Sequence, residues 1–168
     1  PVHGKPLIHW HLQALSACGV DDVVLVGGYR MDRLRDLNVT LVENKDFAST
    51  NMVCSLLSAG QYLKGDFVMG YGDIVYNPGV FKSLLEGAGD ISVVVDRNWQ
   101  SYWERRTNDV LSDAESLQVN ERGRITSIGQ KVSSNREIQG QYIGLVFFRN
   151  EGWAAATAMI DKEREAKK

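Results

Sequence analysis

Long apolar runs, an excess of one charge and cysteine are all scarce in this chain of 168 residues. No run approaches the roughly 18 apolar residues of a membrane span, so we predict no membrane span. Lysine and arginine number 19 against 21 acidic residues, and this near balance argues against a nucleic-acid polymer or an anionic membrane as partner. The two cysteines, Cys18 and Cys54, lack a metal-type spacing, which favours buried thiols in a cytoplasmic protein.

The remaining composition is that of a globular domain, with 43% hydrophobic and 24% charged residues. Residues 1–95 alternate between helical and strand patterns, which predicts an α/β architecture with right-handed crossovers and a largely parallel sheet. The predicted helices are Pro6–Cys18, Met31–Leu37, a helix capped by Ser49 or Thr50 that ends near Tyr62, and one capped by Asn77 that ends near Glu86. The predicted strands are Val23–Val26, Val39–Val42, Phe67–Gly70 and Ile91–Val95.

The pattern changes after Asp96. Two short strands, Leu117–Val119 and Ile125–Ile128, flank a polar turn and predict a hairpin. A strand over Gln141–Phe148 and a helix over Glu151–Glu165 follow. We therefore expect one domain whose sheet is parallel at the front and mixed at the back.

Asp73 follows the apolar strand Phe67–Gly70 and has glycine beside it. Ligands of open α/β sheets bind at the carboxyl ends of the strands, and the absence of a side chain at Gly72 lets a ligand approach the backbone. Mg²⁺ binds through one or two carboxylates together with phosphate oxygens, so Asp73 is a candidate metal ligand. A simple turn, in which the aspartate bonds its own backbone, explains the same residues.

The segment after the second strand is a candidate nucleotide site. It places amides and hydroxyls at a predicted helix start, where they suit base edges or phosphates: Asn44, Thr50, Asn51 and Ser55. Plain helix capping by Ser49 or Thr50 accounts for part of this pattern, and the two roles are compatible.

An acidic and aromatic segment follows the fourth strand. Asp96 ends that strand, and Trp99, Tyr102 and Trp103 share one face if the segment is helical. Ring faces beside an acid suit a quaternary ammonium group, whereas packing against the sheet is the alternative. Arg106 lies three residues after Trp103 and is a candidate to bind phosphate, or a surface residue.

Further candidates lie near the hairpin. Lys131 follows a predicted turn over Ile128–Gln130 and is either an anion-binding charge or a solvated lysine. Glu137 and Tyr142 lie on either side of Gly140, and the glycines at 140 and 144 indicate that a ligand or another backbone approaches the strand closely.

Several stretches together resemble the nucleotidyltransferases that make nucleotide sugars and CDP-alcohols, and the resemblance is strongest to phosphocholine cytidylyltransferase-like proteins. The stretches are GKPLIHWHLQAL, VVLVGGY, ENKDFASTNMVCSL, FVMGYGDIVY and GRITSIGQK with QGQYIGL. The resemblance covers nearly the whole chain in order. It implies a Rossmann-like, GT-A-like, mostly parallel mixed sheet flanked by helices in three layers. It also implies Mg²⁺ as cofactor and transfer of a nucleotidyl group, CMP from CTP, to a phosphorylated acceptor with release of pyrophosphate.

The resemblance also implies roles for individual residues. Asp73 is a catalytic, metal-binding residue, and Lys131 is catalytic on the acceptor side. Nucleotide contacts are assigned to Thr50, Asn51, Ser55 and Gly72. Acceptor contacts are assigned to Asp96, Trp99, Tyr102, Trp103, Arg106, Glu137 and Tyr142. Phosphocholine is the first choice of acceptor and a sugar 1-phosphate the second.

The chain departs from the family at both ends. The family's first strand and glycine-rich loop, with an arginine and a lysine for the NTP phosphates, belong upstream of Pro1, and a late acidic metal ligand belongs beyond Lys168. We therefore expect residues 1–168 to form a single nucleotidyltransferase domain that lacks these parts and is incomplete for catalysis. A non-catalytic nucleotide-binding or regulatory fragment is the alternative. The sequence does not determine the oligomeric state.

Overall fold

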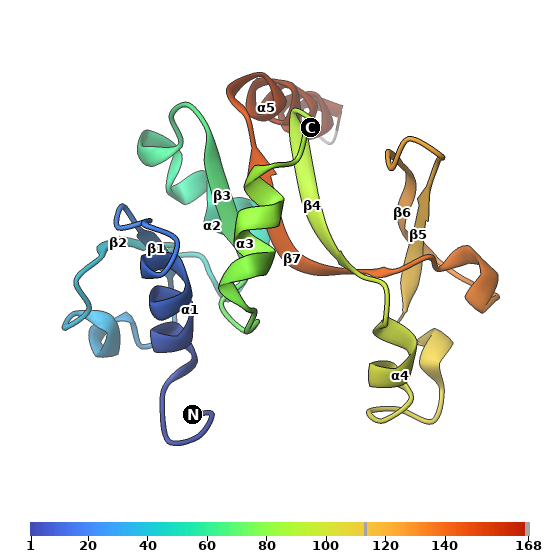
Figure 1. The fold of residues 1–168 in the computed structure, drawn as a ribbon. Coiled ribbons are helices and arrows are strands. Elements are labelled where there is room, and N and C mark those ends of the chain that lie inside the picture. Colours follow the sequence, from blue (N-terminus) through green and yellow to red (C-terminus); the bar gives the residue numbers. More distant parts are fainter. Residues whose placement is uncertain (113, 167–168) are drawn as a thin grey trace. The chain divides into compact units, whose positions relative to one another are not determined.

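The computed structural model describes residues 1–112 and 114–166. The chain divides into two compact units, which we describe separately (Figure 1). The first unit combines Pro1–Ser92 with Val146–Lys168, and the second unit is the intervening Val93–Leu145. Because the second unit is inserted in the first, the chain passes between them twice, once along strand β4 and once along strand β7.

The first unit contains most of the helices. They are α1 (Leu7–Ser16), α2 (Met52–Ser58), α3 (Pro78–Leu85) and α5 (Asn150–Ala166), with short 3₁₀ turns at Met31–Leu34 and Gly60–Tyr62. Its strands are β1 (Val24–Gly27), β2 (Thr40–Glu43) and β3 (Phe67–Gly70). Within the described part of the chain, no helix is both long and apolar enough to cross a membrane.

The second unit lies between the two connecting strands, β4 (Ile91–Asp96) and β7 (Gln141–Phe148). It contains α4 (Trp99–Trp103), β5 (Glu115–Val119) and β6 (Ile125–Lys131), with 3₁₀ turns at Val110–Ser112 and Asn135–Glu137. Strands β5 and β6 form the predicted antiparallel hairpin, in which Leu117 pairs with Ile128.

The strands form three small sheets. Strands β1 and β2 are parallel, from Val24 opposite Thr40 to Gly27 opposite Glu43. The second sheet has the order β3-β7-β4, and the third is the β5-β6 hairpin. The architecture is therefore mixed α/β, as predicted, with one parallel pair and one antiparallel pair defined. A mostly parallel, three-layer sheet stays a prediction.

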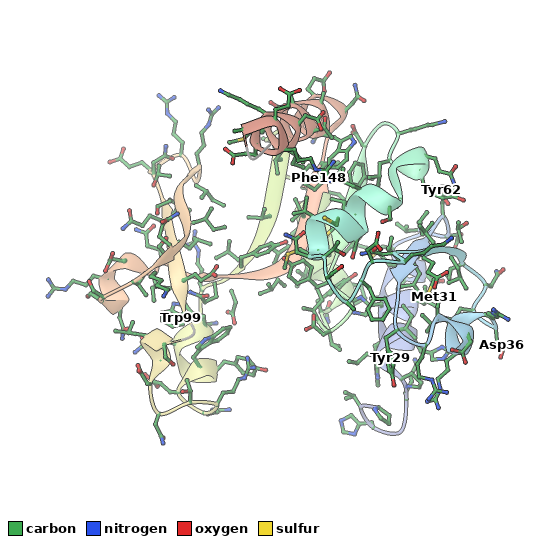
Figure 2. The ribbon with its side chains drawn as sticks, turned by 180° about the vertical axis from the view of Figure 1, so that it is seen from behind. Tyr29, Met31, Asp36, Tyr62, Trp99 and Phe148 are labelled. Carbon is green, nitrogen blue, oxygen red and sulfur yellow. The ribbon has the colours of Figure 1, made fainter. Side chains whose placement is uncertain are left out.

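Aromatic packing forms much of the core of the first unit. Phe148 of β7, labelled in Figure 2, stacks on Phe67 of β3 with ring centroids 5.2 Å apart. Trp153 of α5 meets both rings edge-on. Phe81 of α3 is only 2% exposed. Complete burial of a side chain such as Phe81 stabilises the fold by about 1.5–3 kcal/mol. The contacts among Phe67, Phe148 and Trp153 join β3, β7 and α5.

Two local expectations illustrate how well patterns predict helix starts. Asn77 caps α3 by accepting a hydrogen bond from the Gly79 amide at 2.8 Å, and Pro78 occupies the first turn, as predicted. The predicted cap of α2 by Ser49 or Thr50 is wrong. Both hydroxyls donate to the Asp46 carbonyl instead. Asn51 caps α2, because its side-chain oxygen accepts hydrogen bonds from the amides of Val53 and Cys54.

Candidate functional site

Asp73 lies three residues beyond the end of β3, in a connection between β3 and α3 that is neither helix nor strand. Its side chain is exposed, and a Cβ added to the neighbouring Gly72 would meet no atom within 4 Å. The carboxylate and the adjoining backbone are thus accessible to a ligand. This is the geometry expected for a residue that meets a charged group from solution.

The Asp73 connection rests on helix α1. His11 of α1 is 9% exposed and contacts the ring of Tyr76 edge-on, with centroids 5.6 Å apart. Burial lowers the pKa of His11, while a backbone hydrogen bond at Ile74 and the charge of Asp73 oppose this shift. Burial also raises the pKa of Tyr76, with a smaller contribution from Cys18. Near neutral pH both rings are therefore uncharged.

A buried asparagine organises the predicted nucleotide segment. Asn44 is 6% exposed, and its Nδ2 donates to Thr50 Oγ1 at 2.9 Å and to Ser55 Oγ at 3.0 Å. Its Oδ1 accepts from the Asp46 amide at 3.0 Å. One side chain therefore joins the end of β2, the following loop and helix α2. Thr50 and Ser55, which the sequence placed at the nucleotide, are brought together by this network.

Asn51 has its carboxamide oriented by the start of α2. Its Oδ1 accepts from the amides of Val53 and Cys54 at 3.1 and 3.2 Å. The side chain is exposed, and its Nδ2 takes no part in the cap. Asn51 therefore combines the capping role with an exposed amide donor.

The three aromatic residues of the second unit do not share one environment. Trp99 is 4% exposed and packs in a core with Ala114 and Ile138 (Figure 2). Trp103 packs partly against this core, and Tyr102 is 54% exposed. The packing interpretation therefore describes Trp99, because its ring faces are covered by the unit itself.

Arg106 covers the exposed part of this aromatic group. Its guanidinium lies 5.3 Å from the Tyr102 ring centroid and 5.5 Å from that of Trp103, within the range of a cation–π contact. No described carboxylate forms an ion pair with it. The rings of Tyr102 and Trp103, which would suit a cationic ligand, are thus already in contact with the guanidinium of Arg106. This guanidinium can itself bind an anion.

The two acidic candidates of the second unit have internal partners. Asp96 is half-buried, and its Oδ1 accepts from the Asn98 amide at 2.8 Å. Glu137 Oε1 accepts from the amides of Ser133 and Ser134 and from the Ser133 hydroxyl, at 3.1–3.2 Å, in a capping box. Glu137 is therefore occupied in holding its own turn.

Lys131 does not follow a turn, contrary to the sequence expectation. It lies within β6 opposite Glu115, and its side chain is exposed. Gly129 has φ +76°, and the β5–β6 register shifts between Glu115 and Leu117, so the supposed turn is an irregularity inside the strand. Tyr142 is half-buried in β7.

The residues divide between the two units. The first unit holds Asp73, Gly72, Thr50, Asn51 and Ser55, and the second unit holds the remaining candidates. Sequence reasoning named Asn44 only as one polar group of the nucleotide segment, and it left His11 out of the site. His11 was recognisable as a polar residue on the apolar face of α1.

The match with known proteins decides the family. The MobA-like NTP transferase domain matches residues 1–165. The chain belongs to this family. As a member of the MobA-like NTP transferases it is a nucleotidyltransferase, as the sequence stretches indicated.

The related proteins of this family include a CTP:phosphoglutamine cytidylyltransferase of Campylobacter jejuni. It is 33% identical over 173 residues, which cover 95% of this chain and 68% of the relative. A CMP-5'-(3-aminopropyl)phosphonate synthase of Streptomyces rubellomurinus is 30% identical over 105 residues, which cover 58% of this chain and 17% of that protein. The chain thus spans about two thirds of the first relative and a small part of the second.

The fold of the chain is similar to a solved member of this enzyme class. The structure of the inositol-1-phosphate CTP transferase from T. maritima aligns with a TM-score of 0.64 at 22% identity, over 86% of this chain and 58% of that one. The mixed α/β fold is therefore that of a nucleotidyltransferase.

Proposed function

We propose that the protein transfers CMP from CTP to a phosphorylated small molecule and releases pyrophosphate. The observation that carries the proposal is the exposed carboxylate of Asp73 after β3, in the same compact unit as the loop that Asn44 organises. The family match and the Campylobacter jejuni relative, a CTP:phosphoglutamine cytidylyltransferase, support the choice of CTP.

In the proposed reaction an oxygen of the acceptor phosphate attacks the α-phosphorus of CTP. The new phosphoanhydride bond forms as the bond to pyrophosphate breaks, so no proton has to be supplied. Rate acceleration then depends mainly on positioning and on neutralising negative charge. The chain needs fixed donors and cations rather than a strong general base.

The residues present fit Mg²⁺ bound together with a nucleotide. No group of three or more His, Cys, Asp or Glu side chains among the described residues is arranged to hold a metal. Mg²⁺ often takes only one or two carboxylates and completes its shell with water and phosphate oxygens. Asp73 supplies such a carboxylate at an open position. The ion, when bound, neutralises and orients the phosphates.

On the nucleotide side, the chain contributes a preformed loop. Asn44 holds Thr50 and Ser55, and we assign their hydroxyls and the Asn51 Nδ2 to contacts with cytidine. Cytosine offers acceptors at its carbonyl and ring nitrogen, which the Asn51 amide suits. Gly72 leaves room for the nucleotide beside Asp73.

On the acceptor side, we assign the phosphate to Arg106 and Lys131. Arg106 is oriented by Tyr102 and Trp103 and is the better donor, because a guanidinium binds phosphate with two parallel hydrogen bonds. Asp96, with one oxygen bonded to Asn98, is assigned to a hydroxyl or a cationic group of the acceptor.

The identity of the acceptor is tested by comparing acceptors of different chemical classes. Phosphocholine is favoured by the aromatic and acidic pattern, and a sugar 1-phosphate is favoured by Arg106, which repels a quaternary ammonium group from the same rings. Pyrophosphate release with Mg²⁺ and CTP is measured for phosphocholine, for glucose 1-phosphate and for choline, which lacks the phosphate and serves as the control. Release with either phosphorylated compound supports nucleotidyl transfer.

Two further results complete this experiment. The variant Asp96→Asn is expected to reduce turnover of a cationic acceptor more than that of a neutral sugar, and an equal reduction counts against phosphocholine. CTP binding without release for any phosphorylated acceptor contradicts catalysis and favours a nucleotide-binding module.

A further inference from the structure

The imidazole of His11 lies where the pattern of helix α1 favours an apolar side chain. Leu7, His11 and Ala14 share one face of the helix at i, i+4 and i+7. His11 is 9% exposed, and its Nε2 is buried with no hydrogen-bond partner among the described residues. Such an unpaired group costs about 1–3 kcal/mol, so an imidazole that only filled this space would be a poor choice.

The described interactions of this ring involve the connection that carries Asp73. The ring meets Tyr76 edge-on at 5.6 Å, and the Ile74 backbone and the Asp73 charge both act on it so as to raise the pKa of His11. His11 therefore interacts with three residues of the segment 73–76. The His11 side chain is buried against this segment, whereas Asp73 is exposed.

Residues 71–77 contain neither helix nor strand. A second support comes from Cys18, seven residues after His11, whose Sγ donates to the Pro78 carbonyl at 3.5 Å. Tyr76 in turn stacks on the buried ring of Phe81 with centroids 6.4 Å apart. Helix α1 thus contacts the middle of the connection, and Cys18, just after this helix, contacts the start of α3.

We propose that His11 is a positioning residue, which holds the Ile74–Tyr76 backbone so that Asp73 faces the metal-bound nucleotide. The inference rests on the proposed role of Asp73. A reacting group must be held within about 0.5 Å of its productive position. For an exposed carboxylate on an irregular connection, the buried side chains that pack against the connection provide this support. His11 fulfils this requirement without touching the substrate.

The decisive variant is His11→Phe, which keeps a ring against Tyr76 and removes the polar interaction with the Ile74 backbone. We expect the dissociation constant of Mg²⁺·CTP, measured by calorimetry, to rise about tenfold, the lower end of the effect of groups that orient a metal ligand. His9→Phe is the control, because His9 is exposed on the same helix and should leave binding unchanged. Unchanged binding in His11→Phe overturns the proposal.

A rescue and a double mutant separate positioning from packing. His11→Gln supplies an amide donor in place of the ring nitrogen, and we expect Mg²⁺·CTP binding within about threefold of the parent. In the Asp73→Asn background, His11→Phe should cause no further loss, because the two residues act as one unit. Additive losses, or a loss in His11→Gln as large as in His11→Phe, contradict the proposal.

Amide hydrogen exchange without ligand distinguishes failure of this inference from failure of the proposed function. We expect residues 71–77 to exchange about tenfold faster in His11→Phe than in His9→Phe. Faster exchange in a protein that does not bind Mg²⁺·CTP supports the structural hold on the connection but refutes the assigned role of Asp73. Unchanged exchange in this segment overturns the positioning role of His11 whether or not the nucleotide binds.

Discussion

The polar loop after β2 in the first unit is held by hydrogen bonds, whereas Arg106 of the second unit is held against aromatic rings. In the first unit Asn44 bonds Thr50, Ser55 and Asp46 at once, and each bond fixes a direction. In the second unit Arg106 lies against Tyr102 and Trp103, a contact with little directional demand. The two units therefore differ in how strictly they define the position of a ligand.

Under the proposed function, this difference indicates which unit determines the selectivity for CTP and which unit determines the selectivity for the acceptor. A network of directional bonds suits an invariant substrate, the cytidine nucleotide, because loss of one partner disturbs the others. A charged side chain resting on rings adapts to acceptors of different shape. Variants of the first unit should change the parameters for CTP, and variants of the second unit should change those for the acceptor.

The largest effect is expected for Asp73→Asn. The substitution keeps size and removes the charge that holds Mg²⁺, so we expect kcat to fall at least about 100-fold, the rate equivalent of a few kcal/mol of lost charge stabilisation. The measurement is Mg²⁺-dependent pyrophosphate release, with Asp36→Asn, an exposed aspartate of the first unit, as control (Figure 2). Full activity in Asp73→Asn removes this residue from the site.

A smaller and more selective effect is expected for Arg106→Gln. Loss of a charged hydrogen-bond donor costs about 1.5–3 kcal/mol, so KM for the phosphorylated acceptor should rise roughly tenfold or more. KM for CTP should stay unchanged. Arg105→Gln is the matched control, since Arg105 is exposed and makes no ring contact. An increase in KM for CTP would contradict the assignment of CTP to the first unit and of the acceptor to the second.

For Asn44→Ala the effect should appear in both stability and nucleotide binding. Removal of this buried amide leaves partners unsatisfied, and we expect unfolding free energy to fall by about 1–3 kcal/mol. KM for CTP should rise several-fold because the loop is loosened, while the acceptor parameter is retained. Urea unfolding and initial rates test this, with the exposed Asn38→Ala as control. Retention of both properties would show that the network is dispensable.

The smallest effect concerns Tyr76. Its pKa is raised, mainly by burial, so the folded protein keeps the phenol proton where the unfolded chain begins to lose it. The resulting stability is present below pH 10 and declines as pH rises above 10. We expect the parent to lose more unfolding free energy between pH 9 and 10.5 than Tyr76→Phe does. Tyr62→Phe, at an exposed tyrosine, should behave like the parent.

Sequence patterns located most elements because their signals were local. The strands Phe67–Gly70 and Gln141–Phe148 have the predicted bounds, since both are apolar runs between polar residues or turns. The pairing of strands is a property of the whole chain, so the alternation of elements did not determine how parallel the sheets are. The cap of α2 was missed because Ser49, Thr50 and Asn51 compete for one position, and Asp46 decides among them.

The site was predictable to the extent that chemistry depends on residue type. Asp73 and the polar segment near Thr50 were found from their places after strands, and their roles stay predictions. The burial of Trp99 depends on contacts with Ala114 and Ile138, which helix periodicity does not reveal. Lys131 was misplaced because Gly129 resembles a turn residue, although it serves an irregularity within β6.

The insertion of the second unit in the first has a consequence for synthesis of the protein on the ribosome. Val146, Phe147 and Phe148 complete the core of the first unit, yet they are translated only after all residues of the second unit. Residues 1–92 therefore emerge with an unfinished core and expose apolar surface during elongation. The residues assigned to the acceptor are therefore synthesised before the first unit can complete its core.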